Sequence, residues 1–218
     1  INERKNQLHE VIRLSGMNII IGDVDRPLVI KVASISAARI QVYFIDNEDY
    51  FRRKQISFDA DGKFFEDNGQ RAIFFARGVL ETVKKLRWAP DVIHCQGWIS
   101  NLIPLYLKKA YNGDPIFSGS KIVTSLYGEI DKEAFFPSFK DNIIFGGIKP
   151  ADVSLLENPT GINLAKTAAL YSDGIIFGDK NVDPELVKFC QQENIPNLPF
   201  NEEAMANGHY IEEYDGFY

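Results

Sequence analysis

The chain has 218 residues, 45% of them hydrophobic and 25% charged, which gives it enough apolar mass to bury the core of a globular protein. Its formal net charge of −6 disfavours nonspecific binding to nucleic acid, because that affinity comes from an excess of lysine and arginine. No apolar run reaches the roughly 18 residues that a membrane-spanning helix needs, so insertion into a membrane is not expected.

The N-terminal part of the chain predicts a β-hairpin followed by a third strand. Two apolar runs, Met17–Ile21 and Leu28–Val32, flank residues 23–27, whose aspartates and proline are typical of a turn. The run Ile40–Ile45 is interrupted only by Gln41, and it predicts a strand that is buried on both faces.

Helices and strands alternate through the rest of the chain. The first helix has Asp67 or Asn68 as its candidate N-cap. In chain order, the pattern predicts a helix over Arg71–Trp88, a strand over Asp91–Cys95, a helix over Trp98–Tyr111, a strand over Lys121–Leu126, a helix over Ile162–Tyr171, a strand over Gly174–Phe177 and a helix over Pro184–Gln191. Residues 127–159 have no period and predict a long irregular excursion, which is a candidate functional loop. We therefore expect an α/β fold with a Rossmann-like parallel sheet flanked by helices, to which the β-hairpin is added.

The candidate site lies at the carboxyl ends of these strands. In open parallel sheets, ligands bind where the loops that follow neighbouring strands converge. Here those loops are residues 46–50, 94–98, 127–129 and 178–181. The alternative is that loop residues of these types only satisfy local backbone groups.

Two side chains in these loops have two interpretations each. His94 follows an apolar strand and is either a ligand contact or a packed histidine that backbone groups satisfy. Trp98 is either a stacking platform for a sugar ring or a core residue at the start of a helix. Packing is the favoured interpretation for six phenylalanines, Phe64, Phe65, Phe74, Phe75, Phe135 and Phe136. The basic cluster at 52–54 is expected to be a solvated loop.

Cysteine and histidine usage predicts a protein of the reducing cytoplasm without a metal or cofactor. Cys95 and Cys190 do not make a disulfide framework, and Cys95 has no strongly basic neighbour that would create a reactive thiolate. The three histidines have no close cysteine or histidine partner, so a zinc site is not expected. The chain opens on Ile1 and continues with charged residues rather than an apolar signal-peptide core, from which we expect the true N-terminus to be missing.

Several segments resemble the bacterial glycogen and plant starch synthases. The string DNGQRAIFFARGVLETVKKLRWAPDVIHCQGW, residues 67–98, resembles the family's Asp-Asn start, Arg-Phe-aromatic helix and Pro-Asp-Val-Val-His strand, in that order. YFIDNEDYF, residues 43–51, resembles its Tyr-Phe-Leu-Asp-Asn segment, and LIPLYLKKAY, residues 102–111, resembles the helix after its active-site loop. Weaker similarity continues through ALYSDGIIFGDKNVDPEL, residues 169–186.

This resemblance implies half of a GT-B fold, in which two Rossmann-like domains face each other across a cleft. In that family the C-terminal domain mainly holds the nucleotide sugar, and the N-terminal domain mainly holds the glucan acceptor. We expect residues 1–218 to form a single N-terminal-like domain that lacks the nucleotide-binding half. The family's opening strand and Lys-Thr-Gly-Gly-Leu loop are also expected to lie outside the chain.

The resemblance also implies that the active-site loops are degenerate. The family's His-x-His-Asp-Trp-His loop falls at residues 94–99, where Gln96 and Gly97 replace the second histidine and the aspartate. The histidine of its Thr-Ile-His-Asn turn falls at Tyr127, whose hydroxyl has an unperturbed pKa of about 10. Glu129 or Asp131 is an alternative source of a carboxylate, although acidic loop residues are ordinarily solvated. Because losing one group that stabilises a transition state costs roughly 10²–10³ in rate, no catalytic residue is assigned.

Three functions remain open at this stage. The first is a catalytically weakened or inactive domain that binds α-glucan, or a partner protein of glycogen metabolism, through His94, Gln96, Trp98 and Tyr127. The second is the acceptor half of a split glucosyltransferase, completed by a separate nucleotide-binding polypeptide. The third is a structural or regulatory module that shares only the fold.

Overall fold

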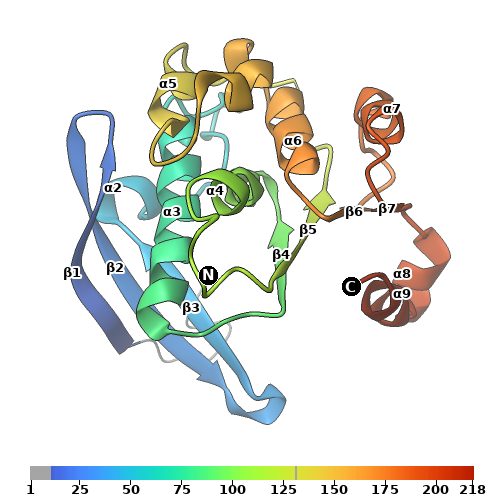
Figure 1. The fold of residues 1–218 in the computed structure, drawn as a ribbon, viewed down its shortest axis with the longest axis horizontal. Coiled ribbons are helices and arrows are strands. Elements are labelled where there is room, and N and C mark those ends of the chain that lie inside the picture. Colours follow the sequence, from blue (N-terminus) through green and yellow to red (C-terminus); the bar gives the residue numbers. More distant parts are fainter. Residues whose placement is uncertain (1–10, 131) are drawn as a thin grey trace.

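The computed structural model describes residues 11–130 and 132–218, whose strands form two sheets. The first sheet is antiparallel, in the order β1 (Val11–Ile21), β2 (Val24–Ile35) and β3 (Ile40–Asp46). The second is parallel, in the order β4 (Val92–Gln96), β5 (Lys121–Leu126), β6 (Gly174–Phe177) and β7 (Asn197–Leu198). The helices are α2 (Glu48–Phe51), α3 (Asn68–Leu86), α4 (Ile103–Lys109), α5 (Phe139–Ile143), α6 (Gly161–Leu170), α7 (Pro184–Gln192), α8 (Glu202–Asn207) and α9 (Tyr210–Phe217), with 3-10 helices η1 (Ser36–Ala38), η2 (Trp98–Ser100) and η3 (Pro150–Glu157). The predicted fold class, a Rossmann-like parallel sheet with helices and an added hairpin, is confirmed (Figure 1).

The predicted hairpin forms, but its turn is tighter than residues 23–27. Gly22 adopts a φ of 58°, in the left-handed region that glycine accepts without strain, and Ile21 already pairs with Val24. Pro27 lies within β2 opposite Asn18, and pairing of β2 with β3 begins only at Val29. The prediction of a longer turn was therefore wrong. Proline has no N–H to donate, but at position 27 the strand has only β1 as a neighbour, so a proline is tolerated there.

Strand β3 is not buried on both faces, as its apolar run predicted. Each of its residues is half-buried or exposed, because β3 pairs antiparallel with β2 and has one face on the core. On the core side, Ile45 and Leu28 approach Gly78 of α3 so closely that a Cβ there would lie 2.9 Å from Ile45 Cγ2. The absence of a side chain at Gly78 therefore lets α3 lie directly on the antiparallel sheet.

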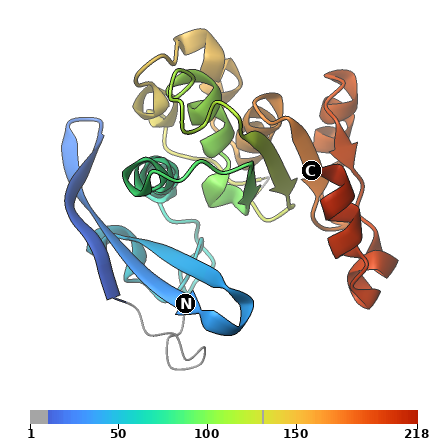
Figure 2. The same cartoon turned by 60° about the horizontal axis from the view of Figure 1, so that its bottom comes forward.

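Helix α3 joins the two sheets into one core. It runs between the antiparallel sheet and the helices that cover the parallel sheet (Figures 1 and 2). Its buried face includes Ile73, Phe74 and Leu80, which belong to one hydrophobic cluster with residues of both halves. Asp67 occupies the N-cap position, yet its carboxylate binds Arg53 rather than the first turn of the helix. Burial of this apolar face, rather than capping, therefore stabilises α3.

The parallel sheet carries helices on both faces and positions the candidate site. The predicted helix over 98–111 divides into η2 and α4, and the excursion over 127–159 contains α5 and η3. The sequence pattern left the segment after residue 191 unassigned, and there the chain forms β7, α8 and α9. Figure 2 shows α8 and α9 beside the parallel strands, on the side away from α4.

Candidate functional site

The loops that follow β4, β5 and β6 converge as expected from a parallel sheet. Gln96 at the end of β4 is in register with Ser125 on β5, and Leu126 is in register with Phe177 at the end of β6. Tyr127 and Gly178 therefore leave the sheet side by side. A Cβ on Gly178 would lie 2.2 Å from Tyr127 Cε1, so the tyrosine ring uses the space that the glycine leaves.

His94 is the centre of this cluster. Its Nε2 lies 2.7 Å from Ser125 Oγ, and its Nδ1 lies 2.8 Å from the Tyr218 hydroxyl and 3.4 Å from Gln96 Nε2. Because the Gln96 amide nitrogen only donates, Nδ1 is the acceptor, and the Nε2 hydrogen is then donated to Ser125. Burial lowers the pKa of His94, which favours this neutral form. Side chains rather than backbone groups thus satisfy the histidine.

Trp98 is a packed residue and not an open platform. The residue is only 6% exposed, and its ring lies 6.0 Å from Phe64 and 6.1 Å from Phe135, measured between centroids. Its indole Nε1 donates to Ser57 Oγ at 2.9 Å. Of the two interpretations, core packing is the one that this geometry supports, because stacking on a sugar requires an exposed ring face. The other phenylalanines assigned to packing are buried or half-buried as well.

Gly97 has a backbone conformation that favours glycine over any residue with a side chain. Its φ of 76° and ψ of 151° lie in a region that residues with a Cβ rarely adopt. No heavy atom of the described residues lies within 4 Å of a Cβ built there, so the space itself is open. The loop therefore presents an exposed Gln96 amide to solvent and no carboxylate at position 97.

Tyr127 keeps its proton and is half-buried. Burial raises the pKa of its hydroxyl; a hydrogen bond with Ser125 opposes this shift, and the nearby carboxylates of Glu129 and Asp179 add to it. The group is a neutral hydrogen-bond donor and acceptor at pH 7 rather than a base. Glu129 is exposed, and Asp131 lies outside the described residues.

Helix α9 brings two further aromatic side chains to His94. The rings of Tyr214 and Tyr218 lie 6.1 Å and 5.7 Å from the imidazole, each edge to face. Tyr210, Tyr214 and Tyr218 are four residues apart, so they share one face of a helix. This four-residue spacing is the sequence pattern that could have predicted an aromatic helix face here, although not its contact with His94.

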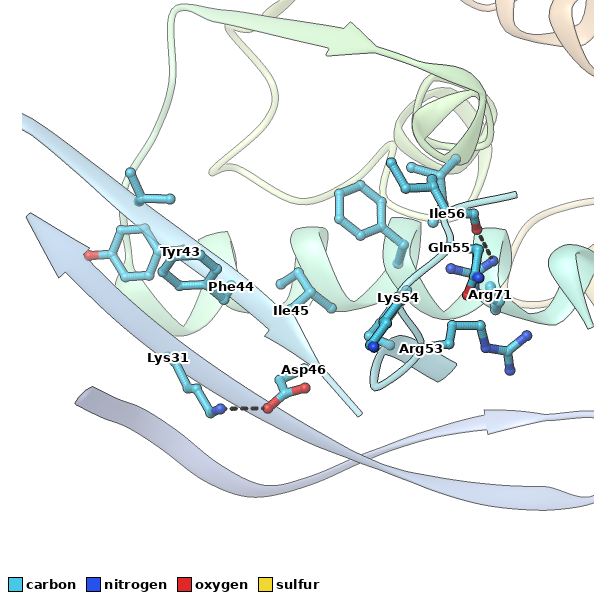
Figure 3. A pocket seen from close by; sticks show the side chains of 14 residues that line it. Lys31, Tyr43, Phe44, Ile45, Asp46, Arg53, Lys54, Gln55, Ile56 and Arg71 are labelled. Atoms are coloured by element: carbon cyan, nitrogen blue, oxygen red, sulfur yellow. Dashed lines mark hydrogen bonds and ion pairs between the residues drawn. The ribbon is translucent and has the colours of Figure 1, made fainter. Parts of the chain in front are cut away.

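The loop 46–50 does not join the cluster around His94. It lies at the end of the antiparallel sheet, next to a cavity. Asn47 caps α2 by accepting hydrogen bonds from Asp49 N and Tyr50 N, and Asp46 pairs with Lys31 at 2.9 Å. Beside them, a cavity of about 530 Å³ lies between β3 and residues 51–56 (Figure 3). Tyr43 and Phe44 line one wall, and Lys54 and Gln55 line the other.

Arg53, at the rim of this cavity, is more than a solvated loop residue. Its guanidinium donates two hydrogen bonds to the Asp67 carboxylate, at 2.9 and 2.6 Å, and lies over the Phe65 ring. Arg52 agrees with the expected solvated loop, since it forms an exposed ion pair with Glu48. The Arg53 charge is already neutralised by Asp67. The cavity therefore offers a ligand mainly the aromatic wall, the Gln55 amide and the Lys54 ammonium group.

Neither cysteine offers reactive chemistry. Both are buried free thiols, and burial raises the pKa of Cys95 to about 12 and that of Cys190 to about 11.

Within the described ranges, no group of three or more histidine, cysteine, aspartate and glutamate side chains could hold a metal ion. Among the helices of that same part, none is long and apolar enough to span a membrane.

Comparison with solved structures defines the class of the fold. The chain superposes with a TM-score of 0.65 on a structure described as the catalytic domain of starch synthase IV from Arabidopsis thaliana bound to ADP and acarbose, over 88% of this chain and 40% of that one. At 12% sequence identity, this likeness concerns the fold alone. The chain thus has the fold of one Rossmann-like half of a GT-B catalytic domain.

Comparison with families and curated proteins is more specific. The starch synthase catalytic domain family matches residues 1–196, and the chain belongs to this family. Glycogen synthase of Chlorobium limicola is 36% identical over 176 residues, which are 79% of this chain and 35% of that protein. Glycogen synthase of Pelodictyon phaeoclathratiforme is 31% identical over 195 residues, 81% of this chain and 38% of that protein. The chain spans little more than a third of the length of these relatives.

Proposed function

We propose that this domain binds α-glucan at the carboxyl ends of β4 and β5 and does not transfer glucose by itself. The observation that carries the proposal is the cluster of hydrogen-bonding side chains around His94, in which Gln96 and Tyr127 offer uncharged donors and acceptors beside aromatic rings. Neutral polar groups beside aromatic rings suit a sugar, which presents hydroxyls and apolar ring faces. Family membership supports the choice of an α-glucan as the ligand.

The chemistry of the same cluster supports binding without transfer. Retaining glucosyl transfer needs groups that stabilise developing positive charge and the departing phosphate. Gly97 carries no side chain, Tyr127 stays protonated, and His94 is neutral with both ring nitrogens hydrogen-bonded to other side chains. The prediction is that purified protein with nucleotide glucose and glycogen incorporates no labelled glucose. Incorporation above the level of a heat-denatured sample would overturn this part of the proposal.

Titration with maltoheptaose locates the binding site. Gln96 and Gln55 are both exposed glutamines, one at the strand ends and the other at the cavity beside β3. We expect Gln96→Ala to weaken binding by roughly two- to tenfold, the effect of losing one neutral hydrogen bond, and Gln55→Ala to leave the affinity unchanged. The opposite result, with weakening by Gln55→Ala alone, would move the glucan site to the cavity beside β3.

A second candidate is the acceptor half of a split glucosyltransferase. It is favoured by membership of the starch synthase catalytic domain family, which matches residues 1–196. On this hypothesis a separate polypeptide would carry the nucleotide-binding domain. Adding such a C-terminal domain from a glycogen synthase to the protein should then restore transfer, whereas unchanged background counts would argue for the binding domain alone.

A further inference from the structure

The end of helix α9 occupies the position at His94 where a sugar hydroxyl would bind. His94 uses Nε2 on Ser125, so Nδ1 is the ring nitrogen that faces away from the sheet. The Tyr218 hydroxyl takes this acceptor at 2.8 Å, and the longer approach of Gln96, at 3.4 Å, reaches the same atom. The ring nitrogen has one lone pair, and Tyr218 makes the short contact with it, so a ligand hydroxyl can take that position only after the Tyr218 hydroxyl has left.

Helix α9 is anchored to the sheet and to α8, including at its last residue, Phe217. A Cβ on Gly174 would lie 2.8 Å from the Phe217 ring, so this glycine lets the helix approach the start of β6 closely. Glu213 of the same helix accepts a hydrogen bond from Asn201, at the start of α8, at 2.7 Å. These contacts hold α9 beside the sheet in a defined orientation.

Tyr218 itself is held less firmly than the rest of α9. Tyr218 is 41% exposed as a whole residue, whereas Phe217 and Tyr214 are half-buried. The contacts that bring it to His94 are one hydrogen bond and one ring edge. A neutral hydrogen bond at a partly exposed position contributes little net free energy, so a ligand with several hydroxyls can replace it.

We infer that the Tyr218 hydroxyl is a displaceable internal ligand of His94, so that the Tyr218 side chain acts as a lid over the proposed glucan site. This inference rests on the proposed function, since it names how that same site is regulated. In the closed state Tyr218 satisfies Nδ1 and its ring shields the imidazole. In the open state a glucan hydroxyl donates to Nδ1, and the Tyr218 side chain rotates away from His94 while α9 stays packed on the sheet through Phe217. The apparent glucan affinity is then the affinity of the open state multiplied by the fraction of molecules that are open.

The test compares Tyr218→Phe with Tyr210→Phe in a maltoheptaose titration. The first variant removes only the hydroxyl that competes for Nδ1, and the second removes the same group from another turn of the same helix. We expect Tyr218→Phe to bind maltoheptaose roughly two- to tenfold more tightly than the wild type, the range that follows from one net hydrogen bond. The affinity of Tyr210→Phe should match the wild type.

NMR of the histidine side-chain nitrogens provides the second readout. With three histidines in the chain, the His94 signals can be assigned by a His94→Gln variant. The Tyr218→Phe change should shift the Nδ1 signal towards that of an unbonded nitrogen, and maltoheptaose should shift it back. The lid is overturned, and the proposed function stands, if maltoheptaose binds Tyr218→Phe no more tightly than the wild type. If neither protein binds maltoheptaose, the proposed function fails and the lid fails with it.

Discussion

Replacing Trp98 with alanine is expected to lower the free energy of unfolding by about 3–5 kcal/mol, the usual cost of removing a buried large aromatic side chain. The structure supports a value in this range because Trp98 is 6% exposed and contacts the rings of Phe64 and Phe135. The change also leaves Ser57 Oγ without the indole hydrogen bond at 2.9 Å. Trp98→Phe should lose less, because it keeps one aromatic ring and removes only the indole hydrogen bond and part of the buried volume.

Trp88 provides the matched control, since the chain has two tryptophans and this one is 61% exposed. Trp88→Ala should change the free energy of unfolding by less than about 0.5 kcal/mol. Urea denaturation followed by circular dichroism measures all three variants. The packing account of Trp98 is refuted if Trp98→Ala is as stable as Trp88→Ala and instead loses glucan binding, because that is the behaviour of an exposed stacking platform.

Three further predictions follow from contacts in and around the site. Gly178→Ala forces the Tyr127 ring to move and should destabilise the protein by about 1–3 kcal/mol, measured by urea denaturation; unchanged stability would contradict the close approach. Burial lowers the pKa of His94, so its contribution to stability is present above the unfolded pKa of about 6.5 and is lost as the pH falls below it. The free energy of unfolding should accordingly fall more between about pH 7 and pH 5 in the wild type than in His94→Gln, and parallel curves would argue against a buried neutral histidine. Cys95 and Cys190 should stay unmodified by a thiol reagent until urea unfolds the protein, because both are buried and their pKa values are raised to about 12 and about 11; rapid labelling of the native protein would show that they are accessible.

The parallel half of the fold could be predicted because its strands are short apolar runs between clear breaks. The bounds predicted for β5 and β6, Lys121–Leu126 and Gly174–Phe177, agree with the structure. The antiparallel half was harder, because Pro27 is typical of a turn and yet lies within β2. An apolar run such as Ile40–Ile45 also does not reveal whether its strand has neighbours on both faces.

The site could be predicted only in part, because its geometry depends on contacts between distant segments. The convergence of His94 and Tyr127 follows from the rule that strand ends meet at one edge of a parallel sheet. The Tyr218 contact with His94 joins residues 124 positions apart, and no local pattern encodes it. Trp98 stayed ambiguous for a similar reason: its spacing fits a helix, but its burial is decided by partners from two other segments.

Affinity electrophoresis of the wild-type protein in gels with and without glycogen tests the central proposal most directly. If the domain binds α-glucan, its migration relative to a non-binding reference protein should slow as the glycogen concentration rises. The slowing should be weaker for Gln96→Ala than for Gln55→Ala. Equal relative mobility at every glycogen concentration would contradict α-glucan binding and would leave a structural or regulatory module of the family.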